Sequence, residues 1–307
     1  MKPYKKLIER ILSEGEERLD RTGTGTLQVF GASETYDLTE GKIPLITMRK
    51  LGIWFMIKEL LWFMRGTGNC DYLDEQGVKI WKPWTDPETN SIGPLYPVQL
   101  RAWPEVRTTL HEDRDDMPDD TILFESQDEN LVVYERHHDQ LANLIKGLKE
   151  KPFSRRHVIS YWNVPCMPDE SMSPIENVKA GRAALAACHV LLQFNVSKNK
   201  ELSCILYMRS SDVMVGRPTN IAQYSILTHM IAQVCGYKAK SFTIMSGDTH
   251  IYLNHVEQAK ELISRTCFES PRLILNREIK NIDDFELDDF LLINYQHGAP
   301  MKLPVAV

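Results

Sequence analysis

The sequence predicts a single α+β domain built on a large sheet, and two observations lead to this expectation. Segments typical of helices and of strands follow one another without the regular alternation that a parallel α/β fold requires. No internal repeat or linker interrupts the 307 residues, of which 43% are hydrophobic and 25% charged, the proportions of an ordinary globular protein. We therefore expect one domain over residues 1–307.

The spacing of apolar residues predicts helices in four segments. Charged residues are interleaved with Leu7, Ile8 and Ile11 near the N-terminus, which is typical of an amphipathic helix rather than a signal peptide. Residues 51–65 are rich in Leu, Ile, Met and Trp and contain one acidic residue, Glu59, so a mostly buried helix is expected there. Two further helices are expected over residues 138–149 and 220–235.

Three other segments have the composition of strands and hairpins. A loop leading into a hairpin is expected over residues 20–31, because glycines break a helix there and Thr and Val follow. Residues 154–164 are rich in β-branched and aromatic side chains, and two apolar runs between residues 188 and 207 flank the polar turn SKNKE of a hairpin. Residues 107–137 and 165–182 lack such patterns, so we expect insertions there.

Charge and cysteine content exclude several classes of function. A net charge of −6 argues against a general nucleic-acid surface, which needs excess Lys and Arg, although a single phosphate on a small molecule can still be bound. The six cysteines include no C-x-x-C pair, so neither a zinc site nor a disulfide framework is predicted. Free thiols fit a reducing cytoplasm, and no apolar run reaches the roughly 20 residues of a membrane span. We expect a cytoplasmic protein without a metal.

Arginines recur in segments that also contain hydroxyl groups, a combination suited to gripping a phosphate. These segments are DRTGTGT at 20–26, SRR at 154–156 and RSSD at 209–212. A fourth segment, AACH at 186–189, contains Cys188, and a cysteine in such a context is more often a small buried residue than a nucleophile. Paired arginines are also common on solvated surfaces. An arginine-rich phosphate site would lower the pKa of a neighbouring cysteine thiol.

In chain order, the sequence contains DRTGTGT, ELLWF, IW..W, GP.Y, SRR, ACH, RS.DV..G.P.NIA.Y, GDTHIYLNH and a C-terminal PVAV. This series covers nearly the whole chain and strongly resembles the thymidylate synthases. The resemblance implies a homodimer with a large curved mixed sheet at the interface and helices packed on the other face. It also implies that the substrate is a pyrimidine deoxynucleoside monophosphate and that 5,10-methylenetetrahydrofolate donates one carbon.

The resemblance assigns roles in nucleotide binding to the matching positions. Cys188 is implied to be the thiolate that adds to C6 of the pyrimidine and makes C5 nucleophilic. Asn220 is implied to read the base, because an amide can both donate and accept and so matches uracil, whereas cytosine-specific relatives have an acid there. We therefore expect dUMP as substrate. The implied phosphate contacts are Arg21, Arg209 and Ser210, with Arg155 and Arg156 from the partner subunit, and the implied ribose contacts are His250 and Tyr252.

Further roles implied by the resemblance concern proton transfer and folate binding. Glu59, Tyr96 and His189 resemble the network that moves protons and orders water, and Asp212 and Asn220 complete the implied catalytic set. Burial of Glu59 would raise its pKa, which suits proton transfer, although a purely structural hydrogen bond is the alternative. The implied folate contacts are Trp81, Leu185, Asp212 and Gly216.

Departures from the family pattern surround the folate and the reacting atoms, while the nucleotide-binding residues are retained. Met208 replaces Gln, as in the hydroxymethylase branch, and Ala187 replaces Pro. Arg217, Thr219 and Gln223 stand where Leu, Phe and Ser are usual, and Pro97 and Leu100 stand where Gly and Trp are usual. We expect Arg217 and Thr219 to loosen the folate pocket or to admit water.

Both branches of the family form an exocyclic methylene on the nucleotide, and its fate determines the product. Hydride from tetrahydrofolate gives dTMP and dihydrofolate, whereas water gives 5-hydroxymethyl-dUMP and unoxidised tetrahydrofolate. The departures favour the dUMP hydroxymethylase. Trp81 and the PVAV tail, whose closure excludes solvent, favour the alternative, a thymidylate synthase. An inactive nucleotide-binding homologue is disfavoured, because Cys188 and all the phosphate contacts are retained.

Overall fold

The computed structural model describes residues 1–19, 23–110, 121–126 and 130–304, and its contacts divide the chain into two units. The first unit comprises Met1–Leu61, Ile145–Val158 and Cys188–Val307, and the second comprises Trp62–Leu144 and Ile159–Ala187. The expectation of one domain over residues 1–307 stays a prediction. Within the described ranges, no helix is long and apolar enough to cross a membrane.

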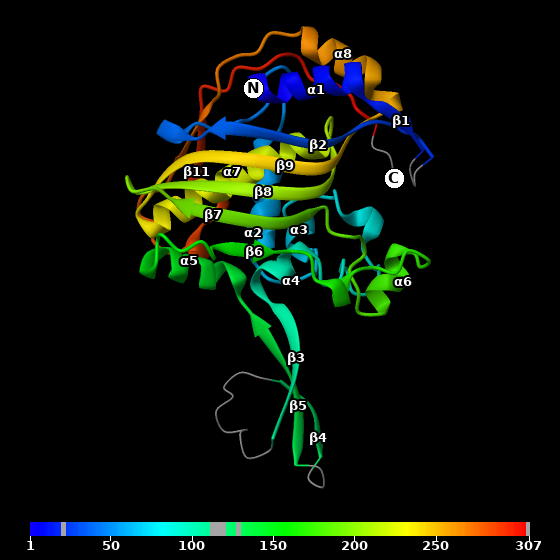
Figure 1. The fold of residues 1–307 in the computed structure, drawn as a ribbon, viewed down its shortest axis with the longest axis vertical. Coiled ribbons are helices and arrows are strands. Elements are labelled where there is room, and N and C mark those ends of the chain that lie inside the picture. The colour runs from blue at the N-terminus through cyan, green and yellow to red at the C-terminus, as the bar shows by residue number, and fades with distance from the viewer. Residues whose placement is uncertain (20–22, 111–120, 127–129, 305–307) are drawn as a thin grey trace. The chain divides into compact units, whose positions relative to one another are not determined.

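The first unit contains a six-stranded mixed sheet, apart from Ile159 and Ser160 of its edge strand, which belong to the second unit (Figure 1). In order across the sheet, its strands are β1 (Glu16–Arg18), β2 (Thr26–Asp37), β9 (Lys238–Tyr252), β8 (Glu201–Asp212), β7 (His189–Val196) and β6 (Val158–Ser160). Strands β8 and β9 are parallel, whereas β1–β2, β2–β9 and β7–β8 are antiparallel. The mixed sheet confirms the predicted α+β class, and the β7–β8 pair confirms the hairpin.

Helix α7 (Gly216–Cys235) connects β8 to β9 and packs against both strands. Side chains alternate along β8, so that Cys204 and Leu206 are buried while Ile205 and Tyr207 are exposed. One face of the sheet is therefore covered and the other is open. The helix ends at Gly236, whose φ of 72° is the left-handed conformation that glycine adopts without steric cost.

The other elements of the first unit surround this sheet. Helix α1 (Lys2–Glu14) packs on β2 and on α8 (Val256–Ser264), and β10 (Arg272–Leu275) pairs with β11 (Phe290–Ile293). Helices α2 (Ile53–Phe63) and α5 (Gln140–Glu150) cross the boundary between the units. The predicted helices are thus confirmed to within a few residues. Helix α7 begins four residues early, because a proline is tolerated in a first turn.

The second unit contains a three-stranded antiparallel sheet and short helices. The strands, in order, are β3 (Trp103–Leu110), β5 (Leu131–His138) and β4 (Thr121–Ser126), and the helices are α3 (Asp71–Glu75), α4 (Tyr96–Arg101) and α6 (Pro174–Lys179). The insertion expected at 107–137 is therefore largely a sheet, and its acidic run at 111–120 lies outside the described residues. Of the strand expected at 154–164, only β6 forms, because the Ser154 N–H closes a turn by donating to the Lys151 carbonyl oxygen at 2.9 Å and Val164–Cys166 form a 3₁₀ helix.

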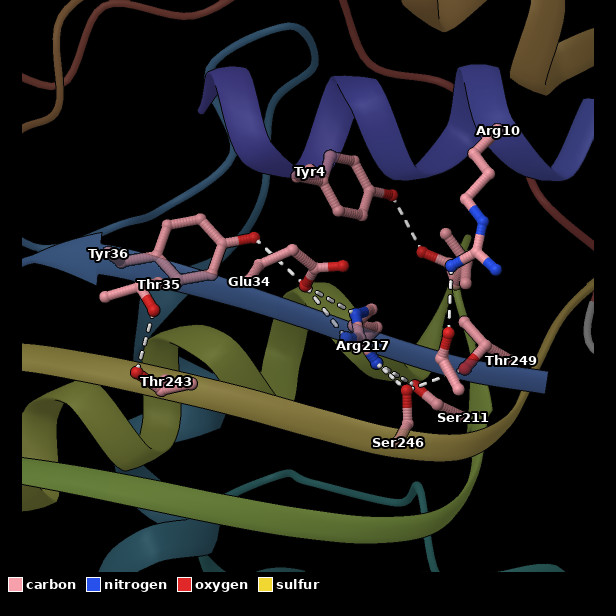
Figure 2. Close-up of polar contacts among 12 residues, drawn as sticks. Tyr4, Arg10, Glu34, Thr35, Tyr36, Ser211, Arg217, Thr243, Ser246 and Thr249 are labelled. Atoms are coloured by element: carbon pink, nitrogen blue, oxygen red, sulfur yellow. Dashed lines mark hydrogen bonds and ion pairs between the residues drawn. The ribbon is translucent and has the colours of Figure 1, made fainter. Parts of the chain in front are cut away.

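Figure 2 shows a polar network inside the first unit, centred on Arg217 in the first turn of α7. The Arg217 side chain has 0% solvent exposure. Its Nε and Nη2 donate to Glu34 Oε2 on β2 at 3.0 and 2.8 Å. Its Nη1 donates to the hydroxyl groups of Ser211 on β8 and Ser246 on β9, at 2.9 and 3.0 Å. The guanidinium therefore joins the start of α7 to three strands.

The Arg217 guanidinium is thus turned into the interior of the first unit, and its expected effect on the folate pocket stays a prediction. A buried guanidinium is tolerated where its donors are paired, and here the carboxylate and two hydroxyl groups pair them. Burial raises the pKa of Glu34, and the Arg217 charge opposes that shift. Glu34 Oε1 has no hydrogen-bond partner in the part of the chain that the structure describes. The Arg217 guanidinium and the Tyr36 hydroxyl, which donates to Glu34 Oε2 at 3.4 Å, therefore both favour the ionised form of Glu34.

Replacing Arg217 with leucine should lower the free energy of unfolding by about 3–5 kcal/mol, because Glu34 would become a buried charge without its partner. Urea unfolding followed by circular dichroism measures this change. The double variant Arg217→Leu with Glu34→Leu should recover most of the loss, since apolar side chains can replace a buried pair.

The matched control is Arg10→Leu, because the Arg10–Glu14 ion pair is exposed. Exposed pairs contribute at most about 1 kcal/mol, so this variant should unfold near the wild-type urea concentration. An Arg217→Leu protein as stable as Arg10→Leu would contradict the stabilising role of the buried pair.

Candidate active site

The carboxyl ends of β8 and β9 bring two of the predicted segments side by side. The strands run parallel, with Ser210 opposite Asp248 and Asp212 opposite His250. Parallel strands end at the same edge of a sheet, and ligands bind at this edge in open α/β sheets. The RSSD and GDTHIY segments therefore meet where a binding site is expected.

Cys188 directly precedes β7 and contacts Arg209 on β8. The Arg209 backbone N–H donates to the Cys188 carbonyl oxygen at 2.9 Å, and Nη2 lies 3.8 Å from Sγ. Burial raises the pKa of the Cys188 thiol, while the Arg209 charge lowers it and the Asp248 charge raises it. In the single chain one guanidinium does not outweigh the loss of solvent, and the lowering expected from a site with all four arginines stays a prediction.

Asp248 links two residues that were predicted to bind the nucleotide. Ser210 Oγ donates to Asp248 Oδ2 at 2.9 Å, and His250 Nδ1 lies 3.3 Å from the same carboxylate. Burial favours the neutral acid, but the imidazole and the hydroxyl outweigh it and lower the pKa of Asp248. Tyr252 packs edge-on against His250, with ring centroids 5.1 Å apart. Sequence reasoning gave Asp248 no role, although it lies two residues before His250 in the GDTHIYLNH motif.

Asn220, His189 and Tyr224 form a hydrogen-bonded chain. Asn220 Nδ2 lies 2.9 Å from His189 Nε2, and the Tyr224 hydroxyl lies 2.8 Å from His189 Nδ1. Burial lowers the pKa of His189 to about 3, so its imidazole is neutral near pH 7. Because an amide nitrogen only donates, Nε2 must accept and Nδ1 must hold the ring proton. This chain fixes the Asn220 amide and directs one of its two N–H groups to His189.

Glu59 on α2 is buried against Gln223 on α7. Gln223 Nε2 donates to Glu59 Oε2 at 3.1 Å and to the Met56 carbonyl oxygen at 3.4 Å. The exposed fractions are 5% for Glu59 and 1% for Gln223. The glutamine that stands where serine is usual therefore contacts the carboxylate implied in proton transfer.

Asp212 and Gly216 lie where β8 leads into α7. Asp212 Oδ1 accepts hydrogen bonds from the backbone N–H groups of Met214 and Val215 at 2.9 and 3.2 Å. These bonds orient the half-buried carboxylate. A carboxylate held in this way fits the donor groups of a pterin ring, so the position suits a folate.

The remaining predicted residues are exposed, belong to the second unit or lie outside the described ranges. Arg155 and Arg156 are exposed, and Arg21 and the last three residues of the PVAV tail are not described. In the second unit, Trp81 and Tyr96 belong to one aromatic cluster, with ring centroids 6.1 Å apart, and Leu185 is half-buried. The roles given to all these residues stay predictions.

A family model described as thymidylate synthase matches residues 2–307. The chain belongs to the thymidylate synthase family. This membership confirms the resemblance drawn from the motifs. Thymidylate synthases transfer one carbon from methylenetetrahydrofolate to C5 of dUMP, so membership implies a folate-dependent transferase of nucleotide biosynthesis.

In this thymidylate synthase family member, the charges beside Cys188 should control the reactivity of its thiol. Arg209→Leu should raise the pKa of Cys188 and slow its alkylation by iodoacetamide several-fold at neutral pH, because a stabilising cation is lost. Asp248→Asn should lower the pKa and speed alkylation. Mass spectrometry of the Cys188 peptide across a pH series measures both effects.

The control for charge is Arg209→Lys, which keeps the cation and should alkylate close to the wild-type rate. The same alkylation profile in all four proteins would show that neither Arg209 nor Asp248 influences the thiol.

Proposed function

We propose that the chain is a dUMP hydroxymethylase, which uses methylenetetrahydrofolate to convert dUMP into 5-hydroxymethyl-dUMP. The observation that carries the proposal is the connection of a nucleophile, a cation and a base-reading amide at one edge of the sheet. Cys188 contacts Arg209, and the next residue, His189, holds Asn220. This arrangement suits a covalent adduct with a pyrimidine nucleotide.

The proposed reaction begins when the Cys188 thiolate adds to C6 of the uracil ring, which makes C5 a nucleophile. Methylenetetrahydrofolate supplies the carbon that becomes bonded to C5. Loss of the C5 proton and release of tetrahydrofolate leave an exocyclic methylene on the nucleotide. Water then adds to this methylene, and the electron pair re-forms the C5–C6 double bond as Sγ leaves C6. Glu59, Tyr96 and His189 hold the water and move the protons.

The site residues match the groups of dUMP. The Asn220 amide oxygen accepts from N3–H, and its second N–H donates to O4, so uracil is preferred to cytosine. Arg21, Arg209 and Ser210 bind the phosphate together with Arg155 and Arg156 of the partner subunit. His250 and Tyr252 bind the ribose hydroxyl. Trp81, Leu185, Asp212 and Gly216 bind the folate.

Thr219 supports addition of water rather than hydride. It is half-buried and directly precedes Asn220, where the family usually has phenylalanine. A hydroxyl group in place of an aromatic ring makes room for water and offers it a hydrogen bond. The alternative function is thymidylate synthase, which Trp81 favours, because its place in the aromatic cluster presents a ring for pterin stacking.

The open face of the six-stranded sheet supports the proposed homodimer. Ile205, Tyr207 and Met245 are exposed by 37%, 40% and 41%, and Tyr207 lies opposite Met245 across the β8–β9 pair. Exposed apolar residues that gather in this way are typical of an interface. A two-fold interface would pair this face with its copy and allow each active site to use residues of both chains.

Incubation with dUMP and methylenetetrahydrofolate should yield 5-hydroxymethyl-dUMP, identified by mass spectrometry, without the ultraviolet absorbance of dihydrofolate. Cys188→Ala should lower product formation by roughly a thousandfold or more while still binding dUMP, because the adduct cannot form. A methyl product with matching dihydrofolate would instead identify a thymidylate synthase. Binding of dUMP without any product from the wild-type chain would identify an inactive homologue.

Mixing two inactive variants, Arg156→Ala and Cys188→Ala, should restore activity if the sites are shared. After random subunit exchange, half of the dimers are mixed and each has one intact site, so about a quarter of wild-type activity is expected. Turnover measured before and after exchange tests this. Exchange without recovery, confirmed by native mass spectrometry, would contradict the contribution of Arg156 across the interface.

A further inference from the structure

We propose that Gln223 is a positioning residue that holds the Glu59 side chain as an oriented carboxylate during proton transfer. This proposal rests on the proposed function, because that function gives Glu59 its role. Gln223 itself matches no implied catalytic or binding position, and it stands where the family usually has serine.

The contact joins two helices through a buried amide. Gln223 Nε2, on α7, donates to Glu59 Oε2 on α2 at 3.1 Å. Both side chains are almost completely buried, so bulk water does not compete strongly for this bond. A hydrogen bond to a charged group is stronger than one between neutral groups, and it favours the ionised form of the acid.

The orientation of the amide is determined by a second acceptor. The Met56 carbonyl oxygen lies 3.4 Å from the same Nε2 atom, so the nitrogen faces two acceptors. A rotated amide would place Gln223 Oε1 against the carbonyl oxygen and the carboxylate, where two lone-pair contacts would repel it. The backbone of α2 therefore keeps the N–H groups directed toward Glu59, and the amide supports the carboxylate rather than the neutral acid.

The carbonyl oxygen of the Gln223 amide shows that packing alone does not account for a glutamine at this position. Gln223 Oε1 is buried and has no hydrogen-bond partner among the residues that the structure describes. A buried acceptor without a partner destabilises the folded chain, and an apolar side chain of similar volume would avoid that. The glutamine is therefore better suited to its contact with Glu59 than to stabilising α7.

The test uses the full-length enzyme and release of tritium from C5 of labelled dUMP, a step that precedes either product. A plot of kcat/KM against pH contains a limb that reports the titration of Glu59, and this limb is identified by its absence in Glu59→Gln. In Gln223→Met this limb should move to higher pH, because the carboxylate loses the donor that Gln223 supplies, and kcat should fall roughly tenfold or more. Gln223→Glu, which adds a negative charge, should move the limb further.

Gln233→Met is the matched control, because Gln233 lies on the same helix and its amide donates to the carbonyl oxygens of Asn276 and Ile279. It should leave the pH profile unchanged. A wild-type profile in Gln223→Met would overturn the proposal, and so would failure of both Gln223 variants to fold in urea titrations, since that would make the residue structural. Absence of tritium release from the wild-type enzyme would instead refute the proposed function.

Discussion

The parallel pairing of β8 with β9 is the constraint on which the candidate active site depends. A parallel pair requires a long crossover, and α7 supplies it, so both strands and the first turn of the helix meet at one edge of the sheet. Ser210 and Asp248 become neighbours only in this register. A slip of one residue would turn one of the two side chains to the opposite face and separate them. The parallel pairing of β8 with β9 therefore determines which residues meet at the site.

Three residues of helix α7, spaced three positions apart, each make a polar contact with a different part of the structure. Arg217 bonds to the strands, Asn220 bonds to His189, and Gln223 bonds to Glu59 on α2. Three residues turn an α-helix by about 300°, so each side chain points roughly 60° away from the one before it. One helix can therefore contact β2, β8 and β9, then the start of β7, and then a second helix in succession. The buried Arg217 holds the first turn of α7 in position, because a shift of the helix would separate its guanidinium from Glu34.

Local patterns were sufficient to predict what short segments determine, namely α1, α2, α5 and the β7–β8 hairpin, and the motifs identified the family. They were insufficient where partners lie far apart in sequence. Arg217 was expected at the folate pocket, but its partner Glu34 lies 183 positions away, and no periodicity reports such a contact. The strands within residues 107–137 were missed because pairing with β5, rather than composition, defines them. Asp248 was overlooked for the same reason, since its partner Ser210 comes from β8, 38 positions away.

The raised pKa of Cys188 also could not be predicted from the count of arginines, and it bears on how the proposed enzyme would work. In one chain, desolvation exceeds the effect of Arg209, and Asp248 adds a negative charge nearby. The proposed function would add Arg155 and Arg156 of the partner subunit, and Arg21, as further cations of this site. Each of these cations would lower the pKa of the Cys188 thiol and so oppose the effect of burial, whereas a bound phosphate with a charge of about −2 would raise it. The partner arginines of the proposed dimer would therefore make the Cys188 thiol more acidic than it is in a single chain.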